Sequence, residues 1–223
     1  MIVPSQSQIA KNIIELFKGR RCISLSELLE SHRRYERVVL NLVKTLVEYK
    51  ALKLENDNVC SLGNFTYLVL KMVEMNIIDV EYASTCISWR DFEELVASIL
   101  DEMGFITFKN LRVKCEGKRY EVDIIAIREP RMLVIDCKHW NIKRGASSKI
   151  KNVILAHLSK TRCLSKMRTF KVKYNVSKFI PVIVTLHDVG LRVWNGTFVV
   201  PIFNLVDFIN NIEAYEEYLK VVD

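Results

Sequence analysis

The stretch EVDIIAIREPRMLVIDCKHW, residues 121–140, decides the predicted fold of this chain. Aliphatic and β-branched residues dominate two runs, 120–127 and 132–137, and Glu129-Pro130 separates them. Runs of this length and composition on either side of a proline-containing break predict two strands joined by a short connection. We therefore expect two neighbouring strands of one sheet.

Charged residues interrupt both strands at positions that suit one site. Residues two apart in a strand point to the same face, so Asp136 and Lys138 project together while Cys137 turns away. Pairing of the two strands can bring Asp123 within a few ångströms of Asp136. A carboxylate in so apolar a run is costly to bury unless it is paired or bound to a metal. Two interpretations stay open, namely ion pairs of the aspartates with Lys138 or Arg119, and a metal site.

The metal-site interpretation predicts a definite chemistry. Two carboxylates and a backbone carbonyl form an oxygen-only site of the kind that Mg²⁺ or Mn²⁺ prefers. A lysine beside such a site can orient a water and stabilise negative charge that develops on a phosphate. A glutamate from a neighbouring helix could complete the ligand set. The residues therefore predict hydrolysis of a phosphodiester.

The segments on either side extend the two strands into an α/β domain. Periodicity and turn residues predict helices and strands in the order α-β-β-β-α-β-β-β-α. In that order they are residues 89–103, 105–115, 120–127, 132–137, 147–167, 179–186, 191–194, 197–200 and 203–221. This order predicts a mixed β-sheet flanked by helices.

The strongest compositional signal is a basic stretch without acidic residues. The chain has a formal net charge of +7, and residues 137–187 carry twelve Lys or Arg and no Asp or Glu. A run of one sign suits a polyanion such as DNA, and the alternatives are a solubilising face or a site for an acidic protein. The expected nucleic-acid-binding residues are Lys143, Arg144, Lys149, Lys151, Lys160 and Arg162.

The first 63 residues predict a separate small domain. Helices are expected at 5–18, 24–31 and 35–49, followed by two short strands around a turn. Three helices and a hairpin resemble a winged helix-turn-helix domain, in which the third helix usually enters the DNA major groove. The same scaffold can instead serve protein interaction or dimerisation. Residues 64–88 are expected to form a helical connector.

Taken in order, the motifs of the larger domain resemble the PD-(D/E)xK nuclease superfamily, which has the restriction-endonuclease-like fold. They are a helical Phe-Glu-x-Leu-Val at residues 92–96, then Asp123, then Asp136-x-Lys138. The similarity covers about residues 89–205. It is strongest to Mrr-type restriction endonucleases and to archaeal Holliday-junction-resolvase-like proteins.

The resemblance implies a role for each motif residue. Asp123, Asp136 and Glu93 would bind Mg²⁺ or Mn²⁺ together with the carbonyl oxygen of Cys137. Lys138 would be the catalytic lysine. Glu94 is the competing helical glutamate, because neighbours on a helix point about 100° apart.

A few positions depart from the family pattern or lie beside it. Val122 stands where relatives carry a proline before the aspartate. His157 stands where relatives often carry a glutamine on the following helix, and it either replaces that glutamine or caps a polar face. His139 and Trp140 follow the lysine, and we favour packing at the strand end over contacts with DNA for both.

The resemblance thus implies a Mg²⁺-dependent DNA endonuclease of the Mrr type. Residues 1–63 would position the duplex, residues 89–223 would form the nuclease domain, and the protein would act as a homodimer that cuts both strands. Two alternatives stay open. One is a structure-specific nuclease like the Holliday-junction resolvases, and the other is a non-catalytic winged-helix DNA-binding regulator.

The cysteine spacing argues against a zinc or iron–sulfur site, and the lengths of the apolar segments argue against a membrane location. The six cysteines, at positions 22, 60, 86, 115, 137 and 163, include no Cys-x-x-Cys pair, so we expect no zinc or iron–sulfur site. We see no secretory signal and no run of about 20 apolar residues, so we expect no membrane span. A cytoplasmic location with mostly free thiols follows. The alternative is an intracellular environment that keeps disulfides, as in some hyperthermophiles.

Overall fold

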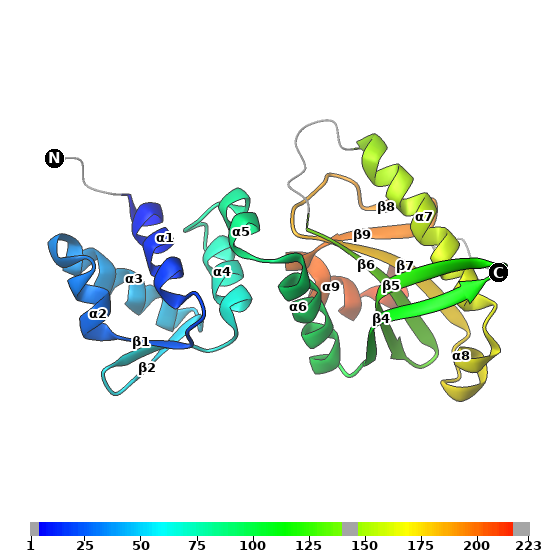
Figure 1. Cartoon of the computed structure of the whole chain (residues 1–223), viewed down its shortest axis with the longest axis horizontal. Coiled ribbons are helices and arrows are strands. Elements are labelled where there is room, and N and C mark those ends of the chain that lie inside the picture. The colour runs from blue at the N-terminus through cyan, green and yellow to red at the C-terminus, as the bar shows by residue number, and fades with distance from the viewer. Residues whose placement is uncertain (1–4, 140–146, 216–223) are drawn as a thin grey trace. The chain divides into compact units, whose positions relative to one another are not determined.

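The computed structural model describes residues 5–139 and 147–215, without the side chains of residues 147–149 (Figure 1). Contacts between residues divide the chain into two compact units, Met1–Ser88 and Trp89–Asp223. Within the described part of the chain, no helix is both long enough and apolar enough to cross a membrane.

The first unit combines five helices with a small sheet in its described part. The helices are α1 (Gln6–Phe17), α2 (Leu25–Glu30), α3 (Glu36–Glu48), α4 (Phe65–Glu74) and α5 (Val80–Cys86), with a 3₁₀ turn at Arg33–Tyr35. The strands β1 (Cys22–Ser24), β2 (Leu52–Glu55) and β3 (Asn58–Ser61) form an antiparallel sheet in the order β1-β3-β2. The predicted helix start at Ser24 is present, because its hydroxyl accepts the N–H of Glu27 at 3.1 Å. The winged-helix assignment stays a prediction.

The segment that we expected to connect the domains, residues 64–88, forms α4 and α5. Both helices pack within the first unit. Lys11 of α1 lies 3.8 Å from the carboxylate of Asp79, and its Nζ lies 4.6 Å from the centre of the Tyr82 ring. These contacts tie α5 to α1.

Four of the six cysteines form disulfides, so the expectation of mostly free thiols is wrong. Cys22 and Cys60 stand opposite each other in β1 and β3, with a Cα–Cα distance of 4.0 Å. Cys115 and Cys163 lie 48 residues apart in sequence and are also bonded. The pairing depends on strand register and on helix packing, which the spacing of the cysteines along the chain does not reveal.

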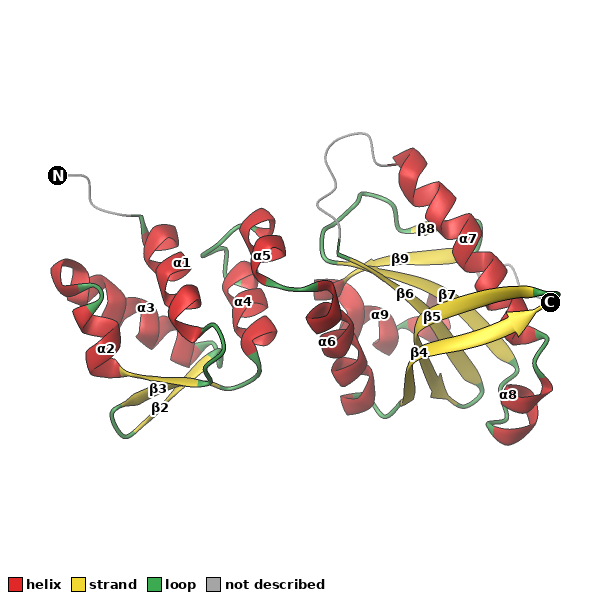
Figure 2. Cartoon of the chain, in the orientation of Figure 1, coloured by secondary structure: helices red, strands yellow, loops and turns green. Residues whose placement is uncertain are grey.

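The second unit is a mixed sheet with helices on both faces (Figure 2). Its strands are β4 (Ile106–Cys115), β5 (Lys118–Arg128), β6 (Arg131–Lys138), β7 (Lys178–Thr185), β8 (Val193–Trp194) and β9 (Thr197–Pro201), in the order β4-β5-β6-β7-β9-β8. Its helices are α6 (Trp89–Glu102), α7 (Ser147–Ser165), α8 (Arg168–Lys173), α9 (Leu205–Asn210) and α10 (Ile212–Tyr215), with a 3₁₀ turn at Ile202–Asn204. The pairs β6–β7 and β7–β9 are parallel and the others are antiparallel, which confirms the predicted mixed α/β fold.

Side chains of β9 show which helices cover which face of this sheet. Val199 packs in a cluster with Ile154 and Leu158 of α7, whereas its neighbour Phe198 lies 5.1 Å from the ring of Phe208 in α9. Because successive strand residues point to opposite faces, α7 and α9 cover opposite faces. The helix α6 packs against β4, β5 and β6.

The last helix differs from the prediction. The periodicity predicts one helix over residues 203–221, but the described part contains two short helices separated by Asn211. The side-chain amide of Asn211 donates to the carbonyl of Asp207 at 2.8 Å. An asparagine that bonds to nearby backbone competes with helix continuation, which explains the break. The helix α8 was not predicted at all.

Candidate active site

Asp136 lies near the end of β6 and is almost fully buried, with 3% of the residue exposed. Its Oδ2 atom lies 2.5 Å from Nζ of Lys138, so the two side chains share a face as predicted. Its Oδ1 atom accepts from Nζ of Lys160 at 2.9 Å. The ion-pair interpretation therefore holds for Asp136, with two lysines instead of one.

Lys160 reaches this site from α7. Asp136 is paired in register with Ile183, and Ile183 packs against α7, so the carboxylate of Asp136 points toward that helix. We expected Lys160 to bind nucleic acid, but the structure places it against Asp136 with 21% of its side chain exposed. The sequence reasoning missed this contact because the two residues belong to elements that meet only in the folded domain.

The electrostatics of Asp136 favour the ionised carboxylate. Burial by itself would raise its pKa, because burial penalises the charged form. The neighbouring His157 and the positive charges of Lys138 and Lys160 outweigh burial and lower the pKa below its usual value. The two lysines thus hold a buried negative charge in place.

Asp123 lies at the point where β5 separates from β6. The last register pair between these strands is Ile124 with Ile135. Beyond it, the Oδ2 atom of Asp123 accepts the backbone N–H of Cys137 at 2.8 Å. Burial, and next the negative charge of Asp136, raise the pKa of Asp123 above its usual value, and the bond from Cys137 opposes that rise. Asp123 is thus fixed beside Asp136 at the strand end.

Glu93 of α6 is, with Asp136, the second buried carboxylate of the site, and its residue is 4% exposed. Burial, and next the charge of Asp123, raise its pKa to about 7. Its Oε1 atom is buried and has no hydrogen-bond partner among the described residues. Glu94 instead is exposed and forms an ion pair with Lys109 at 2.5 Å. Of the two candidate glutamates, Glu93 is the one whose pKa the charges of Asp123 and Asp136 raise.

The three carboxylates are not drawn into a tight cluster. Over residues 5–139 and 150–215, Cys22, Glu55 and Cys60 are the one set of three metal-ligating side chains whose ligand atoms lie within 4.8 Å of one another. Two of those three form a disulfide. The ligand atoms of Glu93, Asp123 and Asp136, which come from α6, β5 and β6, therefore do not all lie within 4.8 Å of one another.

The donor set nevertheless suits a divalent cation. The buried Oε1 of Glu93 has no hydrogen-bond partner among the described residues. The charge of Asp123 raises the pKa of Glu93, and the charge of Asp136 raises the pKa of Asp123. A cation among these carboxylates would lower the cost of ionising each of them. Carboxylate oxygens are the donors that hard cations prefer.

Cys137 and His157 contribute to the site in different ways. Burial raises the pKa of the Cys137 thiol well above its usual value, so the thiol stays protonated and is a poor ligand. The carbonyl of Cys137 as a metal ligand stays a prediction. His157 is 1% exposed, and its Nε2 donates to the carbonyl of Val134 at 2.9 Å. Burial lowers its pKa to about 4, so a neutral His157 anchors α7 to β6.

The remaining predicted residues have varied positions. Nζ of Lys151 lies 5.7 Å from the centre of the Trp194 ring, and Arg162 is exposed on α7. The ring of His139 lies 6.1 Å from that of Phe92, in agreement with the favoured packing role. Outside the described residues lie Lys143, Arg144, Trp140 and the side chain of Lys149.

Comparison with known families agrees with this architecture. Residues 85–162 match the model of the family Mrr_cat, described as restriction endonuclease. The match runs from just before α6 into α7 and includes Glu93, Asp123 and the Asp136-x-Lys138 motif. It confirms the resemblance of this segment to the PD-(D/E)xK nuclease superfamily.

Similar proteins extend over different shares of the chain. An uncharacterized protein of Archaeoglobus fulgidus is 28% identical over 127 residues, which is 57% of this chain and 93% of that protein. Protein VC1899 from Vibrio cholerae matches with a TM-score of 0.34 and 14% identity over 96% of this chain and 50% of its own. Can2 from Sulfobacillus thermosulfidooxidans, solved with cyclic tetra-adenylate, matches with a TM-score of 0.33 and 13% identity. This match covers 87% of this chain and 47% of Can2. The chain spans about half the length of these solved structures.

Proposed function

We propose that the restriction-endonuclease domain of this chain is a divalent-metal-dependent DNA endonuclease. One observation carries the proposal, namely that buried Glu93 and Asp136 and half-buried Asp123 surround the end of β6 beside Lys138, where Glu93 keeps an oxygen without a hydrogen-bond partner among the described residues. Burial of the Glu93 and Asp136 carboxylates is costly for stability, and a function that uses their charge accounts for it. The family match of residues 85–162 supports nuclease chemistry.

In this proposal the oxygens of Asp123, Asp136 and Glu93, with the carbonyl of Cys137, hold Mg²⁺ or Mn²⁺. When bound, the ion lowers the pKa of a water and stabilises negative charge on the phosphate. Lys138 contacts Asp136 and is 20% exposed, so its Nζ can turn to donate to the attacking water or to a phosphate oxygen. Lys160 keeps Asp136 ionised, and the bond from the Cys137 N–H orients Asp123.

We assign binding of the DNA backbone to the basic residues of α7 and of the segment before it. Lys151 and Arg162 lie on the described part of the helix, and Lys143, Arg144 and Lys149 are the further predicted contacts. Contacts of lysine and arginine with phosphates supply affinity but little sequence information. Residues 1–63, as a winged-helix domain, would then position the duplex.

We assign a homodimer to the active form, because a double-strand cut needs one site for each strand. Light scattering on the purified protein with and without DNA measures this directly. A mass of twice 26.0 kDa supports the assignment, and a monomer on cleaved DNA overturns it.

A non-catalytic DNA-binding regulator is the second candidate. It is favoured by the occupation of both oxygens of Asp136 by Lys138 and Lys160, and by the separation of the three carboxylates. This candidate predicts binding of DNA that ignores Mg²⁺ and no cleavage of any substrate.

The test is a nicking assay on supercoiled plasmid and on a four-way junction, with Mg²⁺, Mn²⁺ or EDTA. Asp136→Asn keeps the shape of the side chain but removes its charge, and Asp101→Asn, an exposed position of the same domain, is the matched control. The proposal expects metal-dependent cutting by the wild type and the control and none by Asp136→Asn. Preference for the junction identifies a resolvase. DNA binding without cutting under every condition overturns the nuclease and supports the regulator.

A further inference from the structure

The β4–β5 hairpin extends beyond the rest of the sheet. β5 pairs with β6 only from Ile124 to Arg128, whereas it pairs with β4 from Lys118 to Ile127. Residues 111–122 therefore form a two-stranded overhang. A disulfide between Cys115 and Cys163 fixes its tip to α7.

One face of this overhang is covered and the other is open. Leu111 and Val113 pack against the cluster that contains Leu164 of α7. Because successive strand residues alternate, Arg112 and Lys114 point to the opposite face. Both are exposed, and 81% of the Arg112 side chain is accessible to solvent.

The open face carries an unfavourable pairing of like charges. Lys114 of β4 is the register partner of Arg119 in β5. Like charges directly opposite each other in an antiparallel pair destabilise it. Neither residue forms an ion pair with any other described residue, whereas the next pair, Arg112 and Glu121, is joined at 3.2 Å. Two facing cations without a counter-charge indicate an anionic partner.

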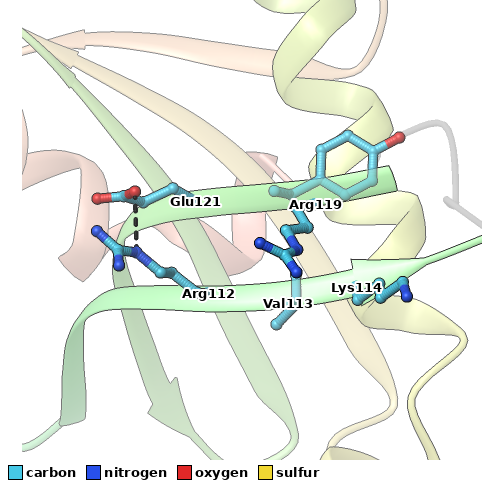
Figure 3. Close-up of a pocket in the computed structure, with 6 residues that line it drawn as sticks. Arg112, Val113, Lys114, Arg119 and Glu121 are labelled. Atoms are coloured by element: carbon cyan, nitrogen blue, oxygen red, sulfur yellow. Dashed lines mark hydrogen bonds and ion pairs between the residues drawn. The ribbon is translucent and has the colours of Figure 1, made fainter. Parts of the chain in front are cut away.

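The same side chains border a hollow of about 460 Å³, as Figure 3 shows. The hollow is lined by Arg112, Val113, Lys114, Arg119, Tyr120 and Glu121. In this view Arg112, Lys114 and Arg119 project from the two neighbouring strands, and we call these three residues the hairpin patch. A two-residue step along a strand advances about 6.8 Å. One DNA strand carries a phosphate per about 3.4 Å of axis, so Arg112 and Lys114 can meet different phosphates.

The hairpin patch lies on the strand that leads into the acidic site. Asp123 follows Arg119 by four residues, a distance of about 14 Å along an extended strand. About four phosphates of one DNA strand, at about 3.4 Å of axis each, cover this distance, so one duplex is long enough to reach both places. The helix α6, which carries Glu93, packs against both strands of the hairpin.

We propose that the hairpin patch is a docking site for the phosphate backbone of duplex DNA and that it holds the duplex against the acidic site. The proposal rests on the proposed function as a DNA nuclease. It adds an interface outside the basic stretch of residues 137–187, on the face of the hairpin that α7 does not cover. The disulfide to α7 keeps this face in a fixed position relative to the sheet.

The test compares two triple variants of the full-length chain that lose the same charge. One carries Arg112→Gln, Lys114→Gln and Arg119→Gln. The control carries Arg168→Gln, Lys171→Gln and Lys173→Gln on α8, which packs against α7. All six side chains are exposed, so both variants are expected to fold, and thermal unfolding checks this. Binding of a labelled duplex is measured by fluorescence anisotropy in EDTA over a salt series, and cleavage is measured separately with Mg²⁺.

The patch variant is expected to bind at least about 10-fold more weakly, and the slope of log affinity against log salt falls by about three. The control is expected to stay within about twofold of the wild type. Equal binding by the two triple variants, while the wild type cuts DNA, overturns the hairpin patch alone. Patch-dependent binding without any cleavage supports the hairpin patch and overturns the nuclease. A wild type that neither binds nor cuts duplex DNA overturns both.

Discussion

Lys160 of α7 and Asp136 of β6 form a partly buried ion pair, with 2.9 Å between Nζ and Oδ1. The two residues are 24 positions apart in sequence, and the pair joins the helix to the strand that carries the Asp136-x-Lys138 motif. Lys138 contacts the other oxygen of the same carboxylate. Asp136 is therefore positioned by α7 as well as by its own strand.

We predict that Lys160→Gln lowers the free energy of unfolding by about 1.5–3 kcal/mol at neutral pH, because a buried carboxylate loses a charged hydrogen-bond donor. Cleavage should fall too, since Asp136 loses part of its orientation. Urea unfolding measures the first effect and the plasmid assay the second. The matched control is Lys44→Gln, which removes an exposed ion pair with Glu48 and should change stability by less than about 1 kcal/mol. Equal losses in both variants would show that the Lys160 pair has no special role.

Glu93 makes stability depend on pH in the metal-free protein. Its pKa is about 7 in the folded state and 4.5 in its ordinary environment. Between these two pH values Glu93 is protonated in the folded state and ionised in the unfolded state. The contribution of Glu93 to the free energy of unfolding is therefore complete below pH 4.5 and is lost as pH rises through 7. Glu93→Gln cannot ionise and should lose less stability than the wild type between about pH 5 and about pH 8. Urea unfolding of both proteins in EDTA at the two pH values checks this. An equal loss of stability by the wild type and by Glu93→Gln would contradict the raised pKa.

The disulfides predict a defined pattern of thiol reactivity. Cys86 and Cys137 are the free cysteines, and Cys137 is buried. Without reductant, a thiol reagent should modify only Cys86 in the native protein and both residues after unfolding. Reduction should expose six thiols and lower stability by about 2–4 kcal/mol for each disulfide lost. Six reactive thiols in the unreduced, unfolded protein would show that the disulfides are absent.

Local signals in the sequence predict much of the fold of the second unit. The turn Asn195-Gly196 predicts the β8–β9 hairpin, and both residues have the positive φ that such a turn needs. The alternation along β6 places Asp136 and Lys138 on one face. These features depend on residues close together in the chain, so the sequence alone predicts them.

Features that depend on tertiary packing were missed or wrong. The three-residue strand β1 exists only because it pairs with β3, and the two disulfides follow from that pairing and from the packing of α7. At the candidate site, the sequence predicts Glu93, Asp123 and Asp136 as neighbours but not Lys160 as their partner. Contacts between a helix and a distant strand leave no periodic trace in the sequence.

The central claim is that the buried carboxylates form a metal-dependent catalytic site, and the adjacent glutamates of α6 test it most directly. Glu93→Gln and Glu94→Gln make the same chemical change at neighbouring positions, one buried beside the aspartates and the other exposed with Lys109. The measurement is the rate of plasmid nicking over a Mn²⁺ titration. We predict a loss of at least about 100-fold for Glu93→Gln, since loss of even an outer partner of a metal ligand costs up to that much. Glu94→Gln should keep the wild-type rate within about twofold. Equal rates for the two variants, or a selective loss in Glu94→Gln, would contradict the account.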